Sequence, residues 1–165
     1  MTDLLNVEDL AVEFRVQAGK IVAVEGVSFR VKPASTVAIV GESGSGKSTI
    51  AQAIMGILPN VAEVTRGSIK FTDPNPGAHS DGRQQMDPVV DIAAMKPDGW
   101  QMQRLRGGRM SMIFQEPMTS LNPVLTIGQQ IRESIVLHLG LGEEESTARA
   151  VELLELVGIP EAEQR

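Results

Sequence analysis

A nine-residue stretch of the chain carries the residue types that bind phosphate groups. It consists of Gly41, Glu42, Ser43, Gly44, Ser45, Gly46, Lys47, Ser48 and Thr49, and it fills the GxxxxGK[ST] pattern of a phosphate-binding loop. Its glycines let the backbone approach phosphate closely and adopt positive φ values without penalty. Lys47 can act as a point charge for the β- and γ-phosphates of a nucleotide, and the Ser48 hydroxyl can serve as a ligand for Mg²⁺. The stretch therefore predicts nucleotide binding.

The residues on either side of this loop predict how it is positioned. The apolar run Thr36–Val40 predicts a buried strand that enters the loop, and Ser48–Leu58 predicts a helix that leaves it. A loop between a strand end and a helix N-terminus presents backbone N–H groups that have no intrahelical partner. Such groups form a concave nest that can close around phosphate oxygens.

The remaining residues predict strands first and helices later. Apolar residues alternate with polar ones over residues 10–16 and 27–31, which is typical of half-buried strands. Residues 73–100 are rich in Pro, Gly, Asp and Gln, so we expect a long solvated insertion with little fixed structure. A short apolar segment, residues 109–114, predicts a returning strand.

Beyond residue 116 the apolar spacing becomes helical. Apolar residues recur on one face of each of two segments, at Ile127, Ile131, Ile135 and Leu139 and then at Ala150, Leu153, Leu154 and Val157. Glu143–Glu145 begin the second helix, where acidic side chains interact favourably with the helix dipole. We therefore expect a nucleotide-binding core over residues 1–115, including the insertion, and an incomplete helical subdomain over residues 116–165.

Composition excludes several classes of protein. With 165 residues and 42% apolar content, the chain can form one packed core with a small subdomain. It has no cysteine, which excludes disulfides and thiolate metal sites. Its net charge of −6 argues against a nucleic-acid-binding surface. Since the sequence has neither a secretory signal pattern nor a long apolar run, we expect a soluble chain whose contact with a membrane goes through another protein.

The segment Met112–Pro123 closely resembles the Q-loop of ABC transporter ATPases, specifically the ATP-binding subunits of the dipeptide, oligopeptide, nickel and glutathione import family. The resemblance extends through four further segments: Leu4–Leu10, Gly41–Ser48, Leu105–Gly107 and Leu153–Pro160. The run Asn122–Gly128 is most similar to the ATPase of glutathione importers. Together these segments cover almost the whole chain.

The resemblance implies a fold and further site residues. The fold would be α/β, a P-loop NTPase core of the ABC ATPase type with an antiparallel edge sheet and the start of a helical subdomain. Gln115 would be the Q-loop glutamine, offering its side-chain carbonyl to Mg²⁺ or to the attacking water and forming the hinge to the helical subdomain. Phe14 matches the aromatic residue that stacks on adenine, and a role as a core residue of an alternating strand is the alternative. Lys47 and Gln115 would be the catalytic residues of this chain.

The resemblance also implies a function and partners. The full-length protein would hydrolyse ATP with Mg²⁺ to drive uptake of peptides or glutathione through a membrane permease. ATP would lie between two such ATPase subunits or domains, peripheral to the cytoplasmic face of the bacterial inner membrane. No Walker B strand, catalytic Glu, signature motif or switch His follows the Q-loop in these 165 residues. We therefore expect a nucleotide-binding domain truncated at its C-terminal side, which is inactive alone.

Three alternatives remain open at this point. A small P-loop kinase would need arginines in a lid over the phosphates, and Arg132 is the only candidate after the Q-loop segment. A non-transporter ABC ATPase that handles nucleic acid is disfavoured by the acidic charge. A non-catalytic fragment is the third alternative.

Overall fold

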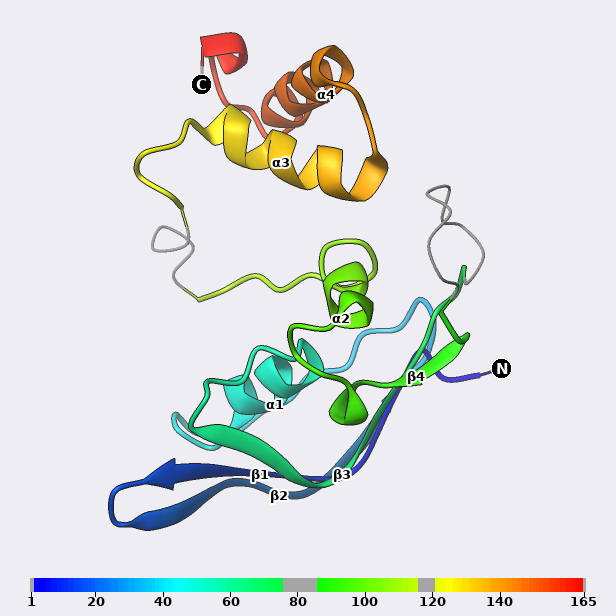
Figure 1. The fold of residues 1–165 in the computed structure, drawn as a ribbon, viewed down its shortest axis with the longest axis vertical. Helices are drawn as coiled ribbons and strands as arrows, with labels where there is room; N and C mark the ends of the chain where they lie inside the picture. Colours follow the sequence, from blue (N-terminus) through cyan, green and yellow to red (C-terminus); the bar gives the residue numbers. More distant parts are fainter. Residues whose placement is uncertain (1, 76–85, 116–120, 165) are drawn as a thin grey trace. The chain divides into compact units, whose positions relative to one another are not determined.

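The protein consists of two compact units, Met1–Arg109 and Met110–Arg165. A computed structural model describes residues 2–75, 86–115 and 121–164 (Figure 1). The division of the chain at residue 115 that the sequence suggests stays a prediction.

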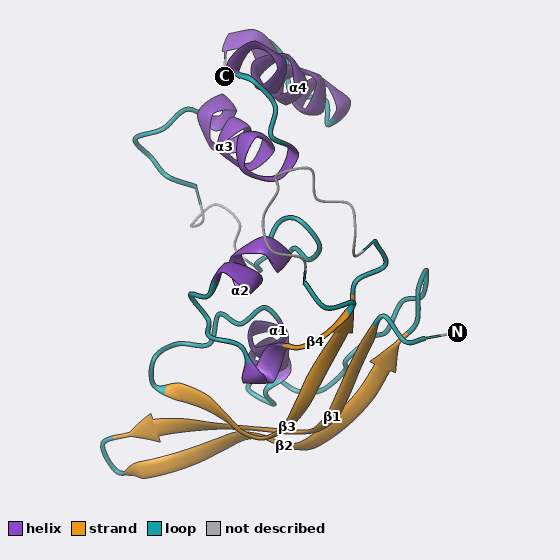
Figure 2. Cartoon of the chain, turned by 45° about the vertical axis from the view of Figure 1, so that its right-hand side comes forward, coloured by secondary structure: helices purple, strands orange, loops and turns teal. Residues whose placement is uncertain are grey.

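The first unit is built on an antiparallel sheet of four strands, as expected for the edge sheet (Figure 2). The strands are β1 (Leu5–Val16), β2 (Gly19–Val31), β3 (Ala62–Thr72) and β4 (Val89–Asp91). Their order in the sheet is β2-β1-β3-β4, and every neighbouring pair is antiparallel. Apolar side chains of the first three strands form the buried core of this unit: Val7, Leu10, Val12, Val24, Ile69 and Phe71.

Two predicted strands are not formed. Residues 36–40 and residues 109–114 belong to no strand in the described part of the chain. A strand needs a neighbour to hydrogen-bond and a second layer to cover its apolar side chains. Val40 and Ile113 are instead 90% and 92% exposed.

The prediction that residues 73–100 form an insertion with little fixed structure is wrong for the second half of this segment. Residues 76–85 lie outside the described residues, but residues 86–94 contain β4 and a 3₁₀ helix, η1 (Ile92–Ala94). The Asp91 carboxylate accepts hydrogen bonds from the backbone N–H groups of Ile69 at 3.0 Å and Ala93 at 3.1 Å. Met86, Val90 and Ile92 are buried. Three apolar residues are too few to produce a recognisable period; of them, Val90 lies in the short edge strand β4 and Ile92 begins η1.

The helix after the phosphate-binding loop is confirmed, but it is shorter than predicted. Helix α1 (Lys47–Ile54) ends at a turn in which Gly56 has a φ of +61°. The guanidinium group of Arg106 donates a hydrogen bond of 2.8 Å to the Met55 carbonyl and another to the Gly56 carbonyl. Arg106 directly follows α2 (Trp100–Leu105), so this segment holds the C-terminal end of α1. A cation at this end also suits the helix dipole.

The second unit contains the two predicted helices. They are α3 (Ile127–Leu139) and α4 (Glu143–Leu156), followed by a 3₁₀ helix, η3 (Ala162–Gln164). Their buried side chains include Ile135, Ala150 and Leu154, as the helical spacing predicts. At the helix ends the same spacing overestimates the buried face, since Leu139 and Val157 are 61% and 71% exposed. None of the helices in the described segments has the length and apolar character needed to cross a bilayer.

Candidate nucleotide-binding site

The phosphate-binding loop rests directly on the sheet at Gly46. This residue is the N-cap of α1 and has a φ of 88°, a left-handed conformation that favours glycine. A Cβ atom placed on Gly46 would collide with the carbonyl oxygen of Ala23 and lie 3.2 Å from Cγ2 of Val24, both in β2. Any side chain at Gly46 would therefore push the loop away from β2.

The N-terminus of α1 suits an anion. Its N-cap residue is Gly46, which has no side chain to cap the helix, and its first turn contains no acidic residue. The partial positive charge of the helix end is therefore not neutralised by a carboxylate of the helix itself. Ser48 is exposed on this first turn, so its hydroxyl is accessible to a ligand.

Lys47 turns back into the loop that it follows. Its Nζ donates hydrogen bonds to the carbonyl oxygens of Gly41 at 2.8 Å and Glu42 at 2.5 Å, and it lies 3.3 Å from Oγ of Ser45. An ammonium group has three donors and no acceptor, so these three oxygens can satisfy it fully. Phosphate oxygens are stronger acceptors for a cation than neutral carbonyls. The loop therefore holds a lysine where an incoming phosphate can replace its present partners.

Phe14 lies on the same face of the sheet as this loop. Val12 and Phe14 are alternate residues of β1 in regular register with β3, so their side chains share a face. Val12 lies opposite Val24, the residue that Gly46 approaches. Phe14 lies opposite Ile21, and β2 contains a bulge between the pair Val12–Val24 and the pair Phe14–Ile21. Because of this bulge, Phe14 and Ile21 stay on the same face as Val12 and Val24. Phe14 is half-buried, which leaves part of its ring accessible.

The opposite face of this part of the sheet carries charge. Glu13 accepts a hydrogen bond of 2.8 Å from Lys20, and Arg15 forms an ion pair with Glu63 on β3. The hydrogen bond from Lys20 to Glu13 raises the pKa of Lys20 above its ordinary value. The sheet therefore has one apolar face toward the loop and one ionic face, and Phe14 lies on the apolar one.

Gln115 lies in the second unit, at an exposed bend. Its assignment as the Q-loop glutamine stays a prediction, and residues 116–120 of the Q-loop segment lie outside the described residues.

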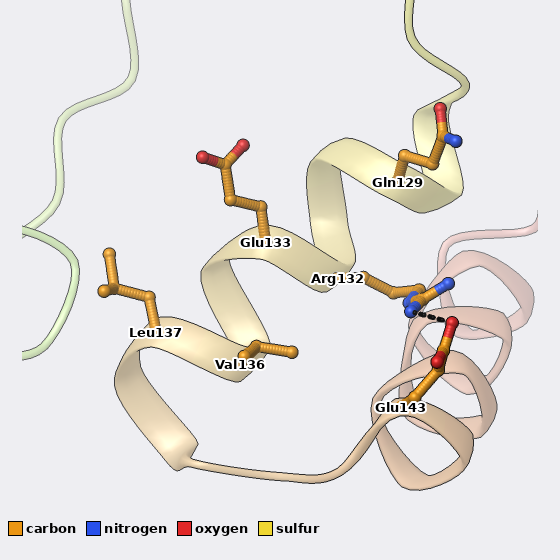
Figure 3. Close-up of a pocket in the computed structure, with 6 residues that line it drawn as sticks. All are labelled: Gln129, Arg132, Glu133, Val136, Leu137 and Glu143. Carbon is orange, nitrogen blue, oxygen red and sulfur yellow. Dashed lines mark hydrogen bonds and ion pairs between the residues drawn. The ribbon is translucent and has the colours of Figure 1, made fainter.

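A second feature of this unit is an open pocket between α3 and α4 with a volume of about 580 Å³. It is lined by Gln129, Arg132, Glu133, Val136, Leu137 and Glu143. Arg132 points from α3 toward α4, where its Nη2 pairs with Oε1 of Glu143 at 3.1 Å (Figure 3). Arg132 therefore joins the two helices through this ion pair. The pairing argues against the alternative in which Arg132 would be the lid arginine of a small P-loop kinase.

Sequence reasoning missed the residues that support the loop. Ala23 and Val24 seat Gly46, yet nothing in an Ala-Val pair within a strand distinguishes it from ordinary core. Arg106 holds the far end of α1, and its neighbourhood Leu105–Gly107 was noticed only through the family resemblance. These residues contact the loop or the end of α1 through the carbonyl of Ala23, the side chain of Val24 and the guanidinium group of Arg106, and a sequence motif does not record such contacts.

Comparison with known proteins identifies the family. The model of the ABC transporter family matches residues 24–165, and the chain belongs to this family. It is 43% identical over its full length to the oligopeptide transport ATP-binding protein OppD of Bacillus subtilis, of which it covers 41%. It is 45% identical over 98% of its length to a putative peptide import ATP-binding protein of Brucella abortus, of which it covers 44%. It is also 40% identical over 97% of its length to the dipeptide transport ATP-binding protein DppD of Lactococcus lactis, of which it covers 41%.

Solved structures confirm the expected fold class. The dimeric structure of MJ0796, described as a bacterial ABC transporter cassette, aligns with a TM-score of 0.71 at 21% identity, over 95% of this chain and 58% of that one. A structure of the same cassette in a post-hydrolysis state, bound to ADP and Pi, aligns equally well. The present chain spans about two-fifths of the length of the three curated relatives named here.

The arrangement of Lys47 leads to a first prediction. Lys47→Ala in the full-length protein should weaken MgATP binding about 10- to 100-fold, because a charge-assisted hydrogen bond to phosphate is worth about 1.5 to 3 kcal/mol. The measurement is a titration with a fluorescent ATP analogue. Lys96→Ala, which removes an exposed lysine elsewhere, should leave affinity unchanged. Equal affinity of Lys47→Ala and wild type would refute the assignment of the loop.

The position of Phe14 leads to a second prediction. Phe14→Ala should raise the Kd for ATP about tenfold, since stacking of a base on an aromatic ring contributes about 1 to 3 kcal/mol. Phe14→Tyr should retain affinity because it keeps the ring, and Val16→Ala on the same strand serves as the control. If Phe14→Ala lowers only the melting temperature, Phe14 is a core residue and the stacking role is wrong.

Proposed function

We propose that this chain is the nucleotide-binding part of an ATPase that powers peptide import through a membrane permease. The observation that carries the proposal is Lys47 at the start of α1, held inside a loop that Gly46 seats on β2. The curated relatives named above, two of them oligopeptide and dipeptide transport ATP-binding proteins, support peptides as the cargo class. Glutathione remains a finer possibility within that class, suggested by the run Asn122–Gly128.

The residues of the site suit ATP and Mg²⁺. Residues 41–49 would hold the phosphates through backbone N–H groups and Lys47, and Phe14 would hold the adenine. Ser48 would provide an oxygen ligand to Mg²⁺, whose charge neutralises the phosphate oxygens during phosphoryl transfer to water. Gln115 would provide a second oxygen near the metal or the water. The role of these side chains is positioning and charge stabilisation, since phosphoryl transfer requires little covalent chemistry from the protein.

The proposal includes partners and a location. A second ATPase subunit or domain would complete the nucleotide site head to tail, and the transmembrane permease subunits would be the further partners. The protein would then lie peripherally on the cytoplasmic face of the bacterial inner membrane. A nucleic-acid partner is not proposed, because a net charge of −6 opposes binding to a polyanion.

The role of Gln115 provides the test of this function. In the full-length protein, Gln115→Ala should keep the Kd for ATP within about threefold, while permease-stimulated hydrolysis falls about tenfold or more, because the residue acts on the water and on the hinge. The measurements are ATP titration and phosphate release with and without permease in lipid vesicles. Gln103→Ala, which alters an exposed glutamine of α2, should match wild type in both.

One outcome would contradict the proposed function, and another would contradict only the role of Gln115. Wild-type protein that binds ATP but gains no hydrolysis from permease would exclude the coupling role. Strong loss of ATP binding in Gln115→Ala together with normal stimulation would place Gln115 in nucleotide binding.

A further inference from the structure

The side chain of Gln130, on the first turn of α3, is bonded to the loop that precedes the helix. Its Oε1 accepts a hydrogen bond of 2.9 Å from the backbone N–H of Asn122. Its Nε2 donates to the carbonyl of Asn122 at 3.1 Å and to the carbonyl of Leu125 at 3.2 Å. The side-chain amide of Gln130 therefore pairs with the N–H and the carbonyl of Asn122 and with the carbonyl of Leu125.

Neighbouring hydrogen bonds complete this attachment. The Asn122 side chain accepts a hydrogen bond from the Val124 N–H at 3.0 Å. Thr126 and Gln129 form a reciprocal capping box at the start of α3, with bonds of 3.0 Å and 3.1 Å. The loop over residues 122–126 is thus fixed to the helix by its own polar groups.

Apolar packing does not explain the position of this loop. Val124 is 83% exposed, and Leu121 and Leu125 are also exposed. With little apolar area buried, the hydrogen bonds to Gln130 are the main restraint on the loop in the described structure. Since Gln130 is only half-buried, replacing it removes this restraint without opening a core cavity.

The place of the loop in the chain gives the restraint a consequence. Asn122 follows Gln115 by seven positions, so the loop over residues 122–126 lies along the chain between Gln115 and α3, where a displacement of the backbone would enter the helix. A loosely attached loop would absorb such a displacement, whereas a loop fixed to α3 would pass it on to the helix.

We propose that Gln130 is a positioning residue that fixes the loop over residues 122–126 to α3, so that the two move together when nucleotide is bound or hydrolysed. This inference rests on the proposed function, because it concerns the coupling between the nucleotide site and the permease. Gln130 would act through this loop and would contact neither nucleotide nor metal.

The test uses the full-length ATPase assembled with its permease in lipid vesicles. Gln130→Ala removes all three hydrogen bonds, and Gln130→Glu keeps the acceptor but removes both donors. Gln103→Glu is the matched control, because the Gln103 amide also donates to a backbone carbonyl, that of Asp98 at 3.3 Å, in the first unit. The three readouts are the Kd for MgATP, hydrolysis with and without permease, and amide hydrogen exchange of residues 121–126.

For both Gln130 variants we expect permease-stimulated hydrolysis to fall about three- to tenfold, a typical range for residues that carry coupling between sites. Basal hydrolysis and the Kd for MgATP should stay within about twofold of wild type, because the nucleotide site is untouched. In Gln130→Ala the Asn122 amide should exchange about fivefold faster, as expected for loss of the hydrogen bond that it donates to Oε1 of Gln130. Gln130→Glu keeps this acceptor and loses only the two donated bonds, so the exchange of the Asn122 amide should rise less than in Gln130→Ala. Gln103→Glu should change none of these quantities.

Three results would overturn the inference. Faster exchange at Asn122 with normal stimulation would show that the restraint exists but plays no part in coupling. An equal fall in basal and stimulated hydrolysis would show a general structural role, and unchanged exchange would show that Gln130 does not restrain the loop. If permease does not stimulate hydrolysis by the wild-type protein, the proposed function itself is wrong, and this inference fails with it. The three results above leave the proposed function standing, so the two failures can be told apart.

Discussion

The close approach of Gly46 to β2 is the contact on which the candidate site depends. A glycine at this position lets the loop turn into α1 while its backbone lies against the Ala23 carbonyl and the Val24 side chain. The start of α1 and Lys47 are therefore fixed relative to the sheet, and the sheet in turn presents Phe14 on the same face. Arg106 holds the opposite end of α1 by its terminal carbonyls. Helix α1, at the start of the candidate nucleotide site, is thus restrained at both ends, which limits the reorganisation that binding would require.

The second unit is organised by polar contacts at its surface as much as by its core. Ile135, Ala150 and Leu154 are buried in it. The ion pair of Arg132 with Glu143 joins the two helices, and Gln130 fixes the preceding loop. Such surface contacts contribute little to stability individually. The bonds of Gln130 set the direction of the loop relative to α3, and the ion pair links α3 to α4.

Local patterns in the sequence predicted those parts of the fold that form from local information. The glycines and Lys47 predict the loop, and alternation over residues 10–16 predicts part of β1. The helical spacing predicts α3 and α4. The predictions failed where a segment depends on distant partners. Residues 36–40 and 109–114 are apolar enough for strands but have no strand neighbour among the described residues, and β4 is too short to show a period. The support given by Ala23 and Gln130 was missed for a related reason, since both act on backbone atoms that no residue pattern encodes.

The central claim is that residues 41–49, seated on β2, are the phosphate-binding element of this chain. It is tested most directly by following backbone amide chemical shifts in the full-length protein while MgATP is added. We expect the largest shifts at the amides of residues 43–48, smaller shifts at Ala23 and Val24, and no saturable change along β4. Largest shifts at the pocket between α3 and α4, with residues 43–48 unchanged at saturating MgATP, would contradict it.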